Sequence, residues 1–296
     1  MTPIKPMLAS PMKKVTITNW TDWAVEEKFD GHRLIVYVNR DYDVQAYARP
    51  RGDGRMIERE LAPGLREQLA KLPDGVYDGE LIGGETSTDV SRLDLRDSLT
   101  FVVFDILQLG EHSCVGRVYS ERRQLLETMF SRVDVDSAVV RLADSFRFHN
   151  ETTFNAFVKG VWKRGGEGAI LKRRTSMYHA GKRNGDWLKK KRQEHASLTI
   201  IGFEATKGTV MNRGPFAKVR LRDDDGNVTS CKTRDDYELD QFRSQYAATK
   251  YGKDHPLYIE GAPHPAIGRR LVIEFQQRTR DGGYRGPVLW DRWEDE

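Results

Sequence analysis

The stretch from Ala24 to Val38 restricts the possible fold of this chain more than any other. Residues 34–38 are a continuous apolar run rich in β-branched and aromatic side chains, which predicts a largely buried strand. Residues 26–33 are mostly charged, with both signs present, and Gly31 marks a turn or a close backbone approach just before the strand. We therefore expect a sheet with a cluster of charges at the end of this strand, where Lys28 lies between acids and an arginine.

Lys28 has two interpretations at this point. A lone lysine is most often a solvated surface charge, because lysine is rarely buried. The alternative is a nucleophile. A lysine attacks only as the neutral amine, so a nucleophilic lysine needs desolvation or neighbouring cations that lower its pKa. The second interpretation requires that the rest of the chain supply a phosphate-binding set.

Composition excludes several classes of protein. The chain has 296 residues, enough for two domains, and its 31% charged and 38% hydrophobic content is typical of a globular rather than a disordered or membrane protein. The formal net charge of +4 permits an anionic partner without proving one. Cys114 and Cys231 are too few and too far apart for a four-cysteine zinc site or a disulfide scaffold.

The chain shows no signal peptide and no apolar run of membrane-spanning length, so we expect a reducing, cytoplasmic location. Residues 3–12 are expected to be an irregular lead-in. Strands are predicted at 20–25, 34–38, 44–48, 76–82, 100–107, 167–172 and 186–192. Helices are predicted at 59–72, at 120–132 with Ser120 as N-cap, and at 152–164.

Several polar residues have a structural and a functional interpretation. Arg49 and Arg51 lie in a Gly/Pro-containing loop, where they are either solvated or suited to phosphate oxygens. Asp78 and Glu80 share one strand face, either exposed on an edge strand or buried with a cation partner. Phe104 either packs in a core or stacks on a flat base.

Two later segments add charges that have the same double interpretation. Glu167 is expected at a junction between a loop and a strand, a usual place for site residues. In the following strand, Trp187, Lys189 and Lys191 share one face, and Leu188, Lys190 and Arg192 share the other. Such a basic run is a solvated face, a nucleic-acid patch or an anion clamp.

The character of the chain changes from about residue 195. Short strands are predicted at 197–203, 217–221, 227–232 and 271–275, with turn signals between them and a helix near 235–250. This pattern favours a small barrel. We place the domain boundary near residues 192–196.

The motifs stand in one order along the chain: Lys28-Phe29-Asp30-Gly31-His32-Arg33, Arg49, Asp78-Gly79-Glu80, Phe104-Asp105, Glu167-Gly168 with Lys172, and Trp187-Leu188-Lys189-Lys190-Lys191. This order closely resembles the covalent nucleotidyltransferase superfamily and, within it, the ATP-dependent DNA ligases. The resemblance implies an α+β chain of the minimal two-domain form. Residues 1–194 would be an adenylation domain of antiparallel sheets with flanking helices, and residues 195–296 a β-barrel OB-fold domain. A late family motif is matched in part by Arg285, Arg292 and Asp295.

The resemblance also implies an activity. Such an enzyme uses ATP and Mg²⁺ to seal 3′-hydroxyl/5′-phosphate nicks in duplex DNA, through a covalent lysyl-AMP and then a DNA-adenylate. It would serve DNA repair, replication or recombination, act as a monomer without a membrane partner, and lie in the cytoplasm (the host cytoplasm if viral).

The same resemblance assigns roles to individual residues. Lys28 would be the nucleophile. The cations Lys189 and Lys191 would grip the α-phosphate, and their charge would favour the neutral amine. Arg33, Arg49 and Glu80 would contact the ribose and the phosphate at the nick. Phe104 would stack on adenine, with Glu26 near the base. Magnesium would bind Glu167 and Asp30. DNA would contact the loop at 49–55, including Arg51, and the set Lys190, Arg192, Lys207, Arg213, Lys218, Arg220 and Arg222.

Three rival interpretations stay open. An mRNA-capping guanylyltransferase shares the Lys28 motif and the OB-fold but handles GTP and an RNA end. An RNA ligase shares the chemistry but prefers an RNA-containing nick. A non-enzymatic nucleic-acid-binding protein built on an OB-fold would need no nucleophile, so changing Lys28 to alanine would leave its activity intact.

Overall fold

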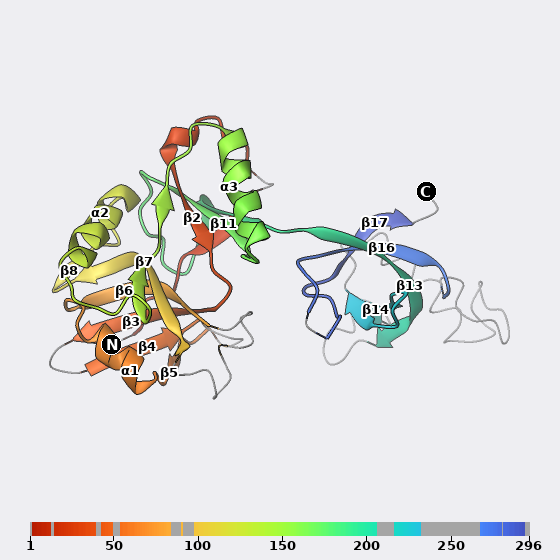
Figure 1. Cartoon of the computed structure of the whole chain (residues 1–296), viewed down its shortest axis with the longest axis horizontal. Helices are drawn as coiled ribbons and strands as arrows, with labels where there is room; N and C mark the ends of the chain where they lie inside the picture. The colour runs from red at the N-terminus through yellow and green to blue at the C-terminus, as the bar shows by residue number, and fades with distance from the viewer. Residues whose placement is uncertain are drawn as a thin grey trace. The chain divides into compact units, whose positions relative to one another are not determined.

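The computed structural model describes residues 2–12, 15–39, 43–49, 54–83, 90, 98–205, 216–231, 267–279 and 281–293. The chain divides into two compact units, Met1–Lys191 and Arg192–Glu296 (Figure 1). Within the described residues, no helix is long and apolar enough to cross a membrane. Cys114 and Cys231 are both buried.

The first unit contains a five-stranded sheet that carries the nucleophile candidate. Its order is β1 (Leu8–Pro11), β12 (Arg183–Lys191), β11 (Gly168–Arg173), β2 (Trp23–Lys28) and β10 (Ser145–Phe146). The β1 strand runs parallel to β12, whereas the other pairs are antiparallel. The prediction of an irregular lead-in is therefore wrong at 8–11, because the β12 edge offers backbone groups that this segment pairs with.

A second sheet in the same unit has the order β5 (Ile57–Arg59), β4 (Asp43–Ala48), β3 (His32–Asn39), β6 (Gly75–Ile82), β7 (Thr100–Leu109) and β8 (His112–Ser113). A short strand, β9 (Val140–Leu142), adds to β7 in parallel. Because β6 lies between β3 and β7, Asp78 belongs to an interior strand and is fully buried. The exposed-edge interpretation of this acid is wrong.

Three α-helices and a short 3₁₀ helix at Trp20–Asp22 complete the described part of the unit. The predicted helix at 59–72 is shorter, with α1 at Pro63–Leu69, because proline suits a first helical turn and residues 57–59 pair with β4. The α2 helix spans Tyr119–Phe130, and its N-cap is Val118 without a side-chain cap, so Ser120 is not the N-cap. The α3 helix spans Glu151–Lys163 and is capped by Asn150.

Apolar packing of the helices fixes where the two sheets lie. The stripe of α3 buries Phe154 and Val158 against Trp23 of β2 and Leu188 of β12, and Figure 1 shows α3 beside β2 and β11. The α2 helix packs Leu126 and Met129 into the core of the second sheet. A further cluster joins the sheets through Met7, Ile35, Phe104, Tyr178 and Trp187. Side chains that point from one sheet toward the other therefore meet around this last cluster.

The second unit is an antiparallel five-stranded sheet with its own core. Its order is β15 (Val228–Cys231), β14 (Phe216–Arg222), β13 (Glu194–Ala205), β16 (Arg270–Phe275) and β17 (Val288–Trp293). Leu198, Ile200, Leu221 and Ile273 are among its fully buried side chains. The predicted helix at 235–250 lies outside the described residues.

A buried acid ties the late hairpin of this unit to the β14–β15 turn. Asp223 accepts hydrogen bonds from Arg278 Nη1 at 2.6 Å, from the Tyr284 hydroxyl at 2.9 Å and from the Asn227 backbone N–H at 2.8 Å. These bonds hold the pKa of Asp223 below its ordinary value, although burial alone would raise it. Arg285 follows in the same hairpin, and its backbone pairs with residues 276 and 277.

Candidate active site

Three adjacent strands of the first sheet present their side chains as a regular grid. Across β2, β11 and β12 the first row is Lys28, Gly168 and Lys191; the second is Glu26, Ile170 and Lys189; the third is Ala24, Lys172 and Trp187. Alternate residues of a strand share one face, about 7 Å apart along the strand. The grid therefore has a cationic end at the first row and an acid and aromatic end at the other.

Gly168 keeps the centre of the cationic row open. A Cβ at this position would collide with the Lys190 carbonyl oxygen, and the residue has φ +148°, which favours glycine. Since Gly168 pairs with Lys28 on one side and Lys191 on the other, no side chain separates the two lysines. The space between them can accept a compact anion.

The Lys28 amine lies at the end of β2, where it contacts the Glu167 carboxylate and the Phe29 carbonyl oxygen, the latter at 3.4 Å. The second carboxylate oxygen of Glu167 contacts the Lys191 amine. One carboxylate thus holds both lysines of the row. An incoming anion would compete with Glu167 for these cations.

Lys189 lies between the two ends of the grid and adds a third cation. Burial, together with the nearby cations Lys191, Arg183 and Lys28, lowers its pKa to about 8, whereas Glu167 opposes the shift. A bound anion would relieve the repulsion between these groups. The cationic end is therefore suited to phosphate.

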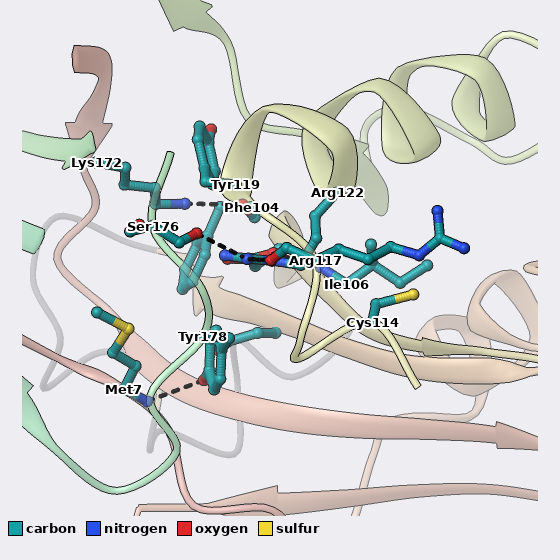
Figure 2. A network of polar contacts seen from close by, with 12 residues as sticks. Met7, Phe104, Ile106, Cys114, Arg117, Tyr119, Arg122, Lys172, Ser176 and Tyr178 are labelled. Atoms are coloured by element: carbon teal, nitrogen blue, oxygen red, sulfur yellow. Dashed lines mark hydrogen bonds and ion pairs between the residues drawn. The ribbon is translucent and has the colours of Figure 1, made fainter. Parts of the chain in front are cut away.

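The acid and aromatic end is almost closed to solvent. Glu26 contacts the Lys172 amine at 2.8 Å and accepts a hydrogen bond from the Tyr119 hydroxyl. The Lys172 amine also donates to the Phe104 carbonyl oxygen at 2.8 Å, and Figure 2 shows it directed from its strand toward Phe104, with Tyr119 nearby. Burial lowers the pKa of Lys172, and Glu26 opposes this shift. Burial and Glu26 raise the pKa of Tyr119.

Trp187 leaves one polar atom without a partner at this end. Its indole Nε1 is the buried side-chain donor that has no hydrogen-bond partner among the described residues. Buried donors are nearly always paired in native proteins. An acceptor on a bound molecule would satisfy this N–H.

The second sheet contributes Arg33, whose guanidinium is fixed in a bidentate ion pair. Its Nε and Nη2 donate to the two oxygens of Asp78 at 2.8 and 2.5 Å, and its Nη1 donates to the Met7 carbonyl oxygen at 2.6 Å. The Tyr178 hydroxyl also donates to Asp78 at 2.6 Å and accepts from the Met7 N–H at 2.9 Å. Although burial opposes the charge, Asp78 raises the pKa of Arg33 above its ordinary value. Arg33 is therefore the cationic partner that the buried carboxylate of Asp78 needs.

Glu80 and Arg49 complete the wall contributed by the second sheet. Burial raises the pKa of Glu80 from 4.5 to about 7, although Lys28 and Arg33 oppose the shift. Arg49 is exposed just after the end of β4. Both line the same pocket as Lys28.

Phe104 has neighbours on both sheets. Its ring lies 5.2 Å from the Arg33 guanidinium carbon and 4.6 Å from the Lys172 amine, measured to the ring centroid. The adjacent Asp105 points elsewhere and forms a fully buried bidentate pair with Arg122 of α2, at 2.7 and 2.9 Å. Asp105 therefore fixes α2 to β7 and leaves Phe104 as the pocket residue of this motif.

These elements enclose a pocket of about 220 Å³. Of the residues that were assigned a site role from the sequence, it brings together eight: Glu26, Lys28, Arg33, Arg49, Glu80, Phe104, Lys189 and Lys191. The remaining lining residues are Leu8, Ala9, Glu27, Phe29, Ile170, Lys172, Arg183 and Trp187.

Several predicted residues lie elsewhere. Asp30 and Glu167 are outside the pocket lining, although Glu167 contacts two lysines that line it. Lys190 is on the opposite strand face, and Arg192 pairs with Glu194. Outside the described residues lie Arg51, Lys207, Arg213, Asp295 and the side chain of Arg292.

Sequence reasoning assigned no role to three pocket residues, although Lys172 was named in a motif. Ile170 and Lys172 lie on the Gly168 face of β11, so strand alternation from Gly168 could have identified both. Arg183 opens β12 on the same alternation as Lys189 and Lys191.

Comparisons with known proteins are consistent with this geometry. Residues 6–191 match the model of the ATP dependent DNA ligase domain. The chain is 32% identical over 195 residues to the multifunctional non-homologous end joining DNA repair protein LigD of Mycobacterium tuberculosis, covering 64% of this chain and 24% of that protein. It is 30% identical over 230 residues to a DNA ligase of Cenarchaeum symbiosum, covering 70% of this chain and 38% of that one.

Solved structures show the same fold. The structure of a Lig E DNA ligase superposes with a TM-score of 0.71 at 20% identity, covering 97% of this chain and 98% of the other. A mycobacterial DNA ligase D complexed with ATP and MES superposes with a TM-score of 0.54 at 23% identity, covering 99% and 97%. These matches define the mixed α/β nucleotidyltransferase fold of ATP-dependent ligases.

Since the family model covers more than half of its length, the chain belongs to the ATP-dependent DNA ligase domain family. The matched part of the chain spans 24% of the length of the LigD relative and 38% of the length of the Cenarchaeum ligase.

Proposed function

We propose that this chain is an ATP-dependent DNA ligase that seals nicks between a 3′-hydroxyl and a 5′-phosphate in duplex DNA. The observation that carries the proposal is the grid on β2, β11 and β12. It places Lys28 across an open glycine from Lys191, with an acid and aromatic recess on the same face.

In the first step, the Lys28 amine attacks the α-phosphorus of ATP. The bond between that phosphorus and the bridging oxygen to the β-phosphate breaks, and pyrophosphate leaves. The nitrogen of Lys28 gives up a proton to solvent as the phosphoramidate forms. Lys189 and Lys191 neutralise the charge that develops on the α-phosphate. The nucleotide phosphates displace Glu167 from these cations, which frees the Lys28 amine from its carboxylate partner.

In the second step, the AMP passes from Lys28 to the 5′-phosphate at the nick. In the third, the 3′-hydroxyl attacks that activated phosphate, forms the phosphodiester and releases AMP. Each step is an in-line phosphoryl transfer, so the protein mainly positions groups and neutralises charge. The wall of the pocket opposite the grid contains Arg33, Arg49 and Glu80. These residues would contact the ribose and the phosphate at the nick.

The adenine would occupy the closed end of the grid. Phe104 and Ile170 line this part of the pocket and offer apolar surface to a flat base, and Glu26 would accept a hydrogen bond from it. An acceptor on the nucleotide would also satisfy the orphan Trp187 N–H.

Magnesium fits this site only together with the nucleotide. Within the part of the chain that the structure describes, no group of three or more His, Cys, Asp or Glu side chains could hold a metal ion. Magnesium commonly uses one or two carboxylates and completes its shell with substrate phosphates and water. Glu167, with Asp30 as the second candidate, would hold it, and the bound ion would neutralise phosphate charge.

The second unit would be the OB-fold domain, so we place the boundary between an adenylation domain at 1–194 and an OB-fold domain at 195–296. Its five antiparallel strands support this assignment. Lys218, Arg220 and Arg222 alternate with buried Val219 and Leu221 on β14, so the three cations share its outer face. This stripe would bind the phosphate backbone without reading sequence. The chain would act as a monomer.

Intact-protein mass after incubation with magnesium and ATP, or GTP, tests the first step. We expect one added AMP on the wild type, and none on Lys28→Ala. A nicked duplex with a labelled 5′-phosphate then tests sealing by the adenylated protein. An added GMP would instead support capping chemistry, and a preference for an RNA-containing nick would support an RNA ligase.

The absence of any adduct from folded protein would refute Lys28 as the nucleophile. If such protein still bound DNA, and if Lys28→Ala bound it equally well, a non-enzymatic binding module would replace the ligase proposal.

A further inference from the structure

Lys172 is a buried cation for which the proposed chemistry has no direct use. Its side chain is 1% exposed, and three aromatic rings surround its amine, with centroids 4.6 Å away for Phe104, 4.9 Å for Tyr119 and 4.6 Å for Trp187. The cations assigned to the phosphates are instead Lys28 and Lys191 in the first row of the grid and Lys189 in the second. Burying an ammonium is expensive unless it is paired, so its partner indicates what it does.

That partner is Glu26, and each of its two carboxylate oxygens has a partner within the protein. One oxygen contacts the Lys172 amine at 2.8 Å, and the other accepts from the Tyr119 hydroxyl. Lys172 comes from β11 and Tyr119 from the first turn of α2, so two separate elements fix the carboxylate in place. Glu26 nevertheless lines the pocket, beside Ile170 and Phe104.

We propose that Lys172 and Tyr119 are positioning residues that hold Glu26 as an ionised hydrogen-bond acceptor and thereby select a purine with a 6-amino group over one with a 6-oxo group. The inference rests on the proposed function, in which this pocket takes a nucleoside triphosphate.

The selectivity follows from the hydrogen-bonding inventory. An ionised carboxylate only accepts hydrogen bonds, so it can pair with the 6-amino group of adenine and repels the 6-oxygen of guanine. Without a cation, a buried carboxyl favours its neutral form, which carries an O–H donor. Such a group can donate to a 6-oxo purine, so the loss of Lys172 weakens the preference for ATP and improves the use of GTP.

The test compares Lys172→Met with the wild type, since methionine has similar length and no charge. The rate of covalent nucleotide transfer to Lys28 is measured by intact mass over a range of ATP and of GTP concentrations. We expect the ATP-to-GTP ratio of kcat/KM to fall by about tenfold or more, mainly through KM, because sites built around a polar contact discriminate strongly. Lys172→Arg, which keeps a cation, should restore most of the ratio.

A matched control is Lys71→Met. Lys71 is exposed beyond the end of α1, where its amine donates to Gln68, so this variant should keep the wild-type ratio. Tyr119→Phe keeps the ring and removes only the hydroxyl. It should lower the ratio in the same direction as Lys172→Met, by a smaller factor.

An equal loss of rate with both nucleotides, leaving the ratio unchanged in folded Lys172→Met, would show a merely structural role and overturn the inference. Circular dichroism establishes folding; if Lys172→Met is unfolded, Tyr119→Phe decides, and an unchanged ratio there overturns the inference. A wild type that takes up neither nucleotide refutes the proposed function itself. That result is distinct from one in which the wild type is adenylated and the variants keep its selectivity.

Discussion

Burial affects the charge of individual pocket residues in different ways. Arg33 has a bidentate carboxylate partner and its pKa is raised, whereas burial brings the pKa of Glu80 to about 7 and that of Lys189 to about 8. The last two groups therefore change charge close to neutral pH. Binding of an anion or a cation at the pocket will shift their protonation.

Glu80 makes the stability of the nucleotide-free protein depend on pH. Its pKa rises from 4.5 to about 7 on folding, so between these values the folded state binds more protons than the unfolded state. Stability should therefore fall as pH rises through this window, by up to about 3 kcal/mol, and level off above pH 7. Urea unfolding of wild type and Glu80→Gln from pH 4.5 to 8 measures this. A difference between the two proteins that stays constant over the range would contradict the shift.

At the scale of elements, β11 owes its position in the grid to one glycine. Gly168→Ala should lower the free energy of unfolding by about 2–4 kcal/mol, because the new Cβ collides with the Lys190 carbonyl oxygen in the neighbouring strand. It should also reduce adenylation, since the β11–β12 pairing sets the distance between Lys28 and Lys191.

Gly185→Ala is the control for this variant. Gly185 is also in a strand of the same sheet, and a Cβ there meets nothing within 4 Å. Thermal or urea unfolding should show little change for Gly185→Ala. Equal losses for the two glycines would contradict the role assigned to Gly168.

The attachment of α2 to β7 depends on the buried pair between Asp105 and Arg122. Asp105→Ala should lower the free energy of unfolding by about 3–5 kcal/mol, because it leaves a fully buried guanidinium without its carboxylate. Glu127→Ala breaks the neighbouring exposed pair with Arg123 on the same helix and should cost at most about 1 kcal/mol. Urea denaturation distinguishes the two variants, and similar losses would argue against a buried ionic anchor.

At the scale of the whole molecule, the two units have separate cores, and their proposed tasks are separate too. The first unit contains all the residues of the pocket, and the second contributes the cationic stripe on β14. Affinity for DNA should therefore depend on the second unit through charge, in a way that salt screens.

The salt dependence of binding to a nicked duplex tests this stripe. Each of Arg220→Ala and Arg222→Ala should reduce the slope of log affinity against log salt by about one, because each removes one phosphate contact. Fluorescence anisotropy measures the slope between about 50 and 200 mM salt, the range over which such contacts lose affinity. Lys71→Ala, a change of exposed charge in the first unit, should leave it unchanged. An unaltered slope in both stripe variants would place the DNA contacts elsewhere.

The sequence alone determined most strands and the strand faces on which the candidate reacting groups lie, because these depend on local patterns. The apolar run after Lys28 predicted β3, and strand alternation by itself put Trp187, Lys189 and Lys191 on one face. The order of the motifs identified the family that the comparisons confirm. The start of α1 was predicted too early and the strand at 8–11 was missed, since pairing of residues 57–59 and 8–11 with other strands decided both.

Only the tertiary structure decided which charges face each other. Asp78 and Arg33 are 45 residues apart in the chain, and Glu26 and Lys172 are farther apart still. Strand order brings each pair together, and no local pattern encodes that order. For the same reason the sequence could not separate Asp105, which anchors a helix, from Phe104, which lines the pocket. Burial and pairing energies depend on neighbours in space, and these follow from the assembled sheets.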